Sequence, residues 1–176
     1  GMFNGSSGLA FDSTYLYVSE SNNNRIQKFD LTTGAFVGWL GKISVTGGTC
    51  LAGANLFTGG WCSGGTATFG TGDGMFNNAK GLAVDTTNGF LFAADTNNRR
   101  IQKFNLSTGA FVGWIGRILA TGGSCLAGVG NFTGGWCSGG TSQSGALDGQ
   151  MNMPQGVTID VSNGFFYVAD SINHRI

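Results

Sequence analysis

Acidic and basic side chains that could form a site recur at a fixed spacing along the chain. An acid stands five residues before an arginine three times, in the pairs Glu20 and Arg25, Asp95 and Arg100, and Asp170 and Arg175. Such a pair suits a salt bridge within or between structural units, and carboxylates near asparagine side chains can also bind calcium. The asparagines that would serve a calcium site are Asn22, Asn97 and Asn173. Because an active site is normally assembled once, the threefold recurrence favours structural acid–arginine pairs.

His174 is the single histidine of the sequence. It occupies the position that Asn24 and Arg99 hold in the two other copies, so we expect a structural or exposed role. Catalytic triads and two-histidine metal sites cannot be built from one histidine alone. We therefore expect no catalytic residue, no metal site and no cofactor.

Four cysteines lie in two matching glycine-rich segments, and eleven residues separate the members of each pair. The even count suggests disulfides, and hence an extracellular or cell-surface location. We expect pairing within each copy, Cys50 with Cys62 and Cys125 with Cys137, because each repeated unit then carries its own cross-link. A shared zinc site and free buried cysteines are the alternatives, although the spacing is longer than that typical of zinc ligands.

Composition argues against two classes of partner. Charged residues make up 10% of the sequence, and nine basic side chains balance nine acidic ones. Nucleic-acid binding draws on clustered Lys and Arg, which are lacking, so we expect no nucleic-acid partner. The uncharged spans 43–72 and 118–147 are too rich in Gly, Ser and Thr for membrane helices of about 20 apolar residues, so we expect no membrane insertion.

The whole sequence repeats with a period of 75 residues between the second and third copies, as the segments Gly74-Met75-Phe76-Asn77 and Gly149-Gln150-Met151-Asn152 show. Repeats of this kind indicate an array of supersecondary units. We expect three units: residues 1–73, residues 74–148 and a truncated third unit at residues 149–176. The chain is then a segment of a longer protein, or a unit that completes its sheets with another chain.

Each unit begins with short apolar runs that read as four antiparallel strands, the pattern of one β-propeller blade. The expected strands are 8–12, 15–19, 25–30 and 35–40, then 81–85, 90–94, 100–105 and 110–115, then 156–160 and 165–169. A blade usually has about 40 residues. The surplus forms two inserts, residues 41–72 and 116–147, each expected to be an ordered loop closed by its disulfide.

Segments of the second unit carry a resemblance to a known family. Residues 81–85 (GLAVD), 90–94 (FLFAA) and 95–104 (DTNNRRIQKF), with Asn173-His174-Arg175 in the third unit, resemble the NHL repeat. The resemblance implies a β-propeller, typically of six blades. Two blades and part of a third do not close a ring. The expected fold is therefore all-β: NHL-like blades of four antiparallel strands, in a partial ring or blade array, with disulfide-closed inserts.

Aromatic residues in the inserts are candidates for an interaction surface. We expect Trp39 and Trp114, at the ends of the fourth strands, to pack between blades. Trp61 and Trp136 either fill the interior of the insert beside the disulfide or present an exposed ring to a protein or glycan. The expected interaction surface consists of Phe57, Trp61, Phe132 and Trp136.

Low charge and near-identical repeats favour a non-enzymatic role. We expect a secreted or cell-surface structural and interaction protein whose blades form a rigid scaffold for adhesion or self-assembly, including filaments. Its partner would be a protein, with a glycan as a further option. Two alternatives stay open: part of a propeller enzyme such as a calcium-dependent lactonase, and an RNA-binding NHL domain, for which the few clustered basic residues are balanced by acids.

Overall fold

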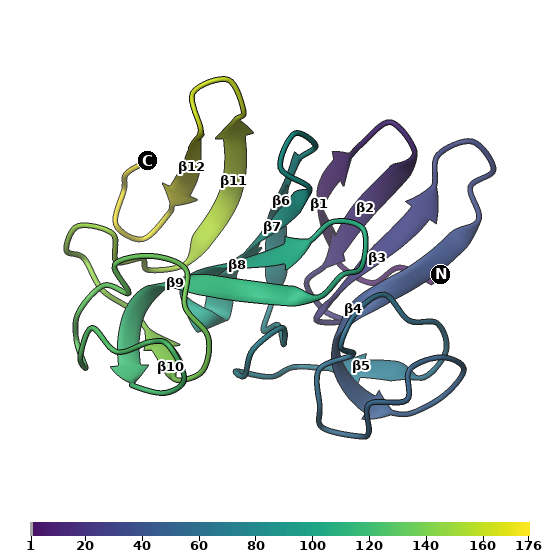
Figure 1. Cartoon of the computed structure of the whole chain (residues 1–176), viewed down its shortest axis with the longest axis horizontal. Coiled ribbons are helices and arrows are strands. Elements are labelled where there is room, and N and C mark those ends of the chain that lie inside the picture. Colours follow the sequence, from purple (N-terminus) through teal and green to yellow (C-terminus); the bar gives the residue numbers. More distant parts are fainter. Residues whose placement is uncertain (1) are drawn as a thin grey trace.

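The structure is a computed structural model that describes residues 2–176. It is all-β, with two five-stranded antiparallel sheets and one two-stranded sheet that fan out beside one another (Figure 1). The first sheet contains β1 (Ser6–Phe11), β2 (Tyr15–Glu20), β3 (Arg25–Asp30), β4 (Phe36–Val45) and β5 (Thr66–Thr68). The second contains β6 (Ala79–Asp85), β7 (Phe90–Asp95), β8 (Arg100–Asn105), β9 (Phe111–Ala120) and β10 (Thr141–Gln143), with the short 3-10 helix η1 (Thr96–Asn98) before β8. The third contains β11 (Pro154–Asp160) and β12 (Phe165–Asp170), and the expected propeller-blade architecture is confirmed.

Aspartates close the hairpins between the first two strands of each sheet. Asp12 Oδ1 accepts hydrogen bonds from the backbone amides of Thr14 and Tyr15, and Asp85 Oδ1 accepts one from Asn88 N. Gly89 then adopts a φ of 74°, which glycine tolerates without steric cost. These local bonds stabilise the hairpin turn within its own sheet.

The inner strands β1, β6 and β11 lie next to one another, and the remaining strands run outward from them. Glycines permit this approach. A Cβ atom on Gly81 would lie 2.6 Å from the carbonyl oxygen of Gln155, and one on Gly8 would collide with the carbonyl oxygen of Lys80. Gly8 and Gly81, which start the predicted first strands of the first two blades, are thus a packing requirement between blades.

Two apolar clusters fill the spaces between neighbouring sheets. The first joins residues of the first two sheets, among them Tyr17, Ile26, Leu40, Phe76, Leu91 and Phe104. The second joins the second and third sheets through Ala83, Phe92, Ile101, Ile115, Met151 and Val157. The second sheet therefore packs apolar residues from both of its faces, as expected for a blade that lies between two neighbours.

The fourth strands are longer than predicted. They were expected to end at Leu40 and Ile115, but β4 runs to Val45 and β9 to Ala120, and each insert adds a short fifth strand. The extension is stabilised because the insert supplies hydrogen bonds along the outer side of the strand. Trp39 N donates to Cys62 O at 2.8 Å, and Ile43 N donates to Leu56 O at 2.8 Å. The insert is thus a continuation of the blade, and it covers a strand edge that would otherwise be open.

Disulfides join Cys50 to Cys62 and Cys125 to Cys137, the pairing expected within each copy. Both are packed on a tryptophan of the fourth strand. Trp39 is 1% exposed and clusters with Ile43 and the first disulfide, and its Nε1 donates to Gly64 O at 2.9 Å. Trp114 does the same in the second insert. The expectation that these two tryptophans pack between blades is wrong, because their ring faces the insert.

No helix among residues 2–176 is long and apolar enough to cross a membrane.

Reduction of the disulfides should loosen the inserts before the blades. Cross-linking a loop of this size contributes about 3 kcal/mol. In hydrogen exchange followed by mass spectrometry, we expect faster exchange at Ile43 and Cys62 in reduced protein, with Leu91 and Ile101 still protected. The double variant Cys50→Ser, Cys62→Ser should reproduce the effect in the first insert only. Equal acceleration in inserts and blades would contradict this assignment.

Candidate functional site

A fully buried carboxylate lies at the centre of the second blade. Asp95 Oδ2 accepts hydrogen bonds from Arg100 Nε at 2.8 Å, Asn98 Nδ2 at 2.8 Å and Gln102 Nε2 at 3.0 Å. Its Oδ1 accepts one from the backbone amide of Asn77 at 2.8 Å. Both side chains of the Asp95–Arg100 pair are 0% exposed. We call this arrangement, with its counterparts in the other blades, the carboxylate clamp.

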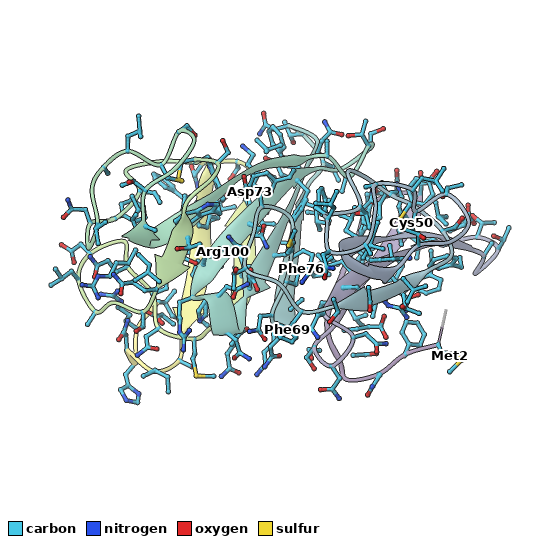
Figure 2. All side chains as sticks on the ribbon, turned by 90° about the horizontal axis from the view of Figure 1, so that it is seen from below. Met2, Cys50, Phe69, Asp73, Phe76 and Arg100 are labelled. Atoms are coloured by element: carbon cyan, nitrogen blue, oxygen red, sulfur yellow. A yellow bond between two sulfur atoms is a disulfide. The ribbon has the colours of Figure 1, made fainter. Side chains whose placement is uncertain are left out.

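The clamp holds the segment that leads from the first insert into the second blade. Arg100 Nη2 donates to Gly72 O at 2.7 Å and to Met75 O at 3.0 Å. Gln102 donates to Met75 O and accepts from Gly74 N. Figure 2 shows Arg100 and Phe76 near the middle of the molecule, with Cys50 toward one end. One carboxylate thus fixes its own blade and the incoming chain.

The same clamp recurs in the other two blades. The first blade uses Glu20, which accepts from Asn4 N, Asn23 Nδ2, Arg25 Nε and Gln27 Nε2. The third blade uses Asp170, which accepts from Asn152 N and Asn173 Nδ2 and lies 3.4 Å from Arg175 Nε. The structure therefore brings together all three acid–arginine pairs that the spacing singled out.

Several members of the clamp were not anticipated. Asn23 and Asn98, three residues after the acid, and Gln27 and Gln102, seven residues after it, donate to the carboxylate. The signal for them was present, because both types recur at the same offset in two copies.

The geometry of the clamp argues against calcium binding. Four N–H donors already use the lone pairs of Asp95, so the oxygens point at donors rather than at an open space. Complete burial raises the pKa of Asp95, while Arg100 and the other donors oppose this shift. Within the described part of the chain, no group of three His, Cys, Asp or Glu residues is placed to hold a metal ion. The clamp therefore acts as a structural element.

His174 lies in the turn after β12, and its side chain is exposed. Its φ is 53°, and Asn24 and Arg99 have φ values of 52° and 53° at the equivalent turns. The three copies therefore share a left-handed backbone at this position, which is uncommon for residues other than glycine. The left-handed backbone at this position is a property of the turn, and it occurs with Asn, Arg or His.

Phe57 and Trp61 pack between the first two blades. Phe57 lies 6.0 Å from Phe104, measured between ring centroids, and Trp61 lies 5.6 Å from Tyr17. Trp61 Nε1 donates to Leu106 O at 3.2 Å. The expectation that these two residues form an exposed interaction surface is therefore wrong, because the neighbouring blade covers them.

Phe132 and Trp136 have the same role between the second and third blades. Both pack against the second apolar cluster. The Trp136 ring lies 5.5 Å from that of Phe92 and 5.6 Å from that of Phe166. All four aromatic residues of the predicted surface thus belong to the packing between blades, and the tryptophans of strand and insert have exchanged the roles expected for them.

Large apolar side chains are exposed on both inserts, and all but Phe69 are aliphatic. Leu51 is 76% exposed and Leu126 is 74% exposed, and each directly follows a buried half-cystine. Leu56 in the first insert and Val129 in the second are also exposed. We call these four residues the insert tips. They are among the apolar side chains that a partner could contact on the two inserts.

The four-stranded blades, their repeated clamp and their packing define a β-propeller repeat protein. The family model of the NHL repeat matches residues 76–104 and 151–176. These two segments therefore match NHL repeats, as their sequence resemblance predicted. No curated protein matches it in sequence.

Solved structures share the fold. One, described as an auxiliary nutrient binding protein from Bacteroides thetaiotaomicron, aligns with a TM-score of 0.52 and 15% identity, covering 95% of this chain and 35% of that chain. Another from the same organism, described as "Putative phosphatase", aligns with a TM-score of 0.56 and 17% identity, covering 95% and 32%. The chain spans about one third of the length of these structures. At these identities the likeness shows the fold alone.

Removal of the clamp's charge should destabilise the second blade strongly. Asp95→Asn leaves Arg100 buried without its counter-charge, which should reduce the free energy of unfolding by about 3–5 kcal/mol. Glu20→Gln is the matched control, because Arg25 is 15% exposed and can turn toward water. Urea denaturation should show the larger loss for Asp95→Asn. Equal losses, or one below about 1 kcal/mol for Asp95→Asn, would contradict the role of the clamp.

Asp30 and Asn105 form a natural pair for a test of acid stability. Asp30 Oδ1 accepts from Thr33 N at 2.8 Å, and Asn105 Oδ1 accepts from Thr108 N at 2.9 Å in the same turn of the next blade. The bonds from Thr33 lower the pKa of Asp30 below its ordinary value of 3.8. Asp30 therefore adds stability above pH 3.8 that is lost as the pH falls through its lowered pKa.

Asp30→Asn keeps the acceptor and removes the titration. Its free energy of unfolding should fall less than that of wild type between about pH 5 and pH 2. Asn105→Asp should show the reverse change. Identical pH profiles for both variants and wild type, measured by urea denaturation, would refute this assignment.

Proposed function

We propose that the chain is part of a secreted or cell-surface interaction protein, in which NHL-like blades form a rigid scaffold and the insert tips contact protein partners in adhesion or self-assembly. The observation that carries the proposal is the repetition of one exposed apolar tip in the same disulfide-held setting. Leu51 and Leu126 are equivalent, exposed to nearly the same extent, and anchored by a neighbouring buried cysteine.

Rigidity of the inserts supports this proposal. Each tip lies on a loop tied down by its disulfide, by a buried tryptophan and by hydrogen bonds along β4 or β9. A loop held in its bound conformation loses little conformational entropy on association, which favours binding. Single exposed leucines are common on proteins, but a repeated leucine on an ordered loop is a suitable contact point.

Repetition also gives more than one contact to each chain. Two equivalent tips held by a rigid scaffold can engage a repetitive partner together, so that the second contact forms at a high effective concentration. This geometry suits adhesion or self-assembly better than a single tight contact. With two tips engaged at once, a weak apolar contact at each tip is sufficient for binding.

Two further observations are compatible with the proposal. Disulfides persist in oxidising compartments, which favours a location outside the cytosol. The Bacteroides thetaiotaomicron protein of similar fold is described as an auxiliary nutrient binding protein, which agrees with a binding role for this chain.

Substitution of the tips should weaken self-association without a loss of folding. In sedimentation velocity over a range of concentrations, Leu51→Ser with Leu126→Ser should shift the full chain toward smaller species, and by more than the two single variants together suggest. The matched control is Val37→Ser with Val112→Ser, another repeated and exposed pair, located on β4 and β9 outside the inserts. An unchanged size distribution, or an equal shift in the control, would refute the proposal.

A further inference from the structure

A pocket lies between the first two blades, away from the carboxylate clamp and from the insert tips. Its volume is about 340 Å³, at the lower end of the range for small-molecule sites. One wall is formed by Tyr15, Tyr17 and Lys28 of the first blade, and the other by turns of the second blade that contain Asn88, Asn105 and Ser107. The pocket is therefore a feature of the interface between blades.

Lys28 is the unusual residue of this pocket. It is 4% exposed, and its Nζ lies 3.8 Å from the ring centroid of Tyr15 and 5.2 Å from that of Trp61. Among residues 2–176, no hydrogen-bond acceptor or carboxylate lies within bonding distance of Nζ. Aromatic faces stabilise the charge in part. Its three N–H donors nevertheless have no partner in the chain.

The nearest acid does not satisfy Lys28. Asp12 is engaged by its own hairpin, because Oδ1 accepts from Thr14 N and Tyr15 N, and Oδ2 accepts from the hydroxyl of Tyr17 at 2.8 Å. Burial lowers the pKa of Lys28, and the charge of Asp12 opposes this shift only in part. Most of the Lys28 side chain is buried, and it lines the pocket, where an acceptor from outside the chain would be favourable.

The opposite wall offers further donors. The Oδ1 atom of Asn105 accepts from Thr108 N and Thr108 Oγ1, which fixes the orientation of the amide. No described residue accepts from Asn105 Nδ2, and the hydroxyls of Tyr15 and Ser107 make no hydrogen bond within the described chain. The pocket is thus lined by one cationic donor, Lys28, and by several neutral donors, with aromatic rings beside them.

This corner of the first blade departs from the repeat. Phe90 and Phe92 stand in the second blade where Tyr15 and Tyr17 stand in the first. The hairpin of the first blade is also shorter by two residues. Lys103 repeats the stacking of Lys28, with Nζ 3.6 Å from the ring of Phe90, but without the phenol groups. The stacked lysine belongs to the scaffold, whereas the polar pocket around Lys28 is particular to the first blade.

We propose that this pocket binds a small organic monocarboxylate, whose carboxylate accepts hydrogen bonds from Lys28 Nζ and Asn105 Nδ2 while its apolar part lies against Leu106 and the tyrosine rings. Asp12 also lines the pocket, but its oxygens accept from Thr14, Tyr15 and Tyr17, so one carboxylate from a ligand can supply the acceptor that Lys28 Nζ lacks. A doubly charged phosphate would lack the guanidinium groups that usually recognise it. The volume admits a ligand about the size of benzoate or a sugar acid.

Benzoate is the probe for this proposal, and benzamide is its uncharged isostere. In 15N-resolved NMR titrations of the full chain, benzoate should shift the side-chain amide of Asn105 and the backbone amides of Leu106 and Ser107 saturably. Benzamide should do so at least tenfold more weakly, because a hydrogen bond to a charged group is stronger than a neutral one. Inorganic phosphate that binds as well as benzoate would overturn the assignment to carboxylates. So would the absence of any saturable shift.

Asn105→Asp is the decisive variant. Asp30 fills the equivalent turn in the first blade, so the fold accepts an aspartate there, while the added charge repels an anion. Benzoate affinity should fall at least tenfold, with urea denaturation at neutral pH unchanged. Lys28→Met should also abolish binding, and Lys103→Met, its matched control, should retain it. Binding that persists in both Asn105→Asp and Lys28→Met would overturn the proposal.

Discussion

The carboxylate of Asp95 is buried completely, so every hydrogen bond that water would give it must come from the protein. Burial of an unpaired carboxylate would cost several kcal/mol, which makes its donors mutually dependent. Arg100, Asn98 and Gln102 come from the blade, and the amide of Asn77 comes from the chain that enters it. The carboxylate is therefore satisfied only when the strands of the blade are in the correct order and the incoming chain is in place. Because the clamp recurs in each blade, the same requirement applies to every blade of the array.

The clamp fixes each blade internally, and aromatic packing joins one blade to the next. Trp61 and Phe57 reach from the first insert into the space against the second blade, and Trp136 and Phe132 do so one blade later. The insert thus has two faces: its tryptophan packs between blades, while its disulfide packs on the tryptophan of the fourth strand. The insert is thus anchored at two places, by a half-buried tryptophan between the blades and by a buried disulfide on the fourth strand.

The sequence was sufficient to predict what repetition and local chemistry determine. Strand positions, hairpin aspartates and cysteine pairing follow from spacing that recurs in each copy, and the acid–arginine spacing identified the clamp. The sequence did not predict which neighbour a given side chain faces. Trp39 and Trp61 differ in role because β4 continues past Leu40, and this continuation depends on hydrogen bonds to an insert with no regular pattern of its own. The aliphatic tips were missed for the same reason, since exposure is set by packing.

Among buried side chains and turns, a feature that recurs from blade to blade belongs to the scaffold. The stacked lysine, the clamp and the left-handed turn recur, so none of them distinguishes one blade from another. The first blade differs where Tyr15 and Tyr17 replace phenylalanine and the hairpin shortens, and these changes add polar groups to the space around Lys28. A ring face is enough to hold a stacked lysine in place. The Tyr17 hydroxyl bonds to Asp12, whereas the Tyr15 hydroxyl makes no bond within the described chain and adds nothing to the stacking, which is the physical reason to assign it to a ligand.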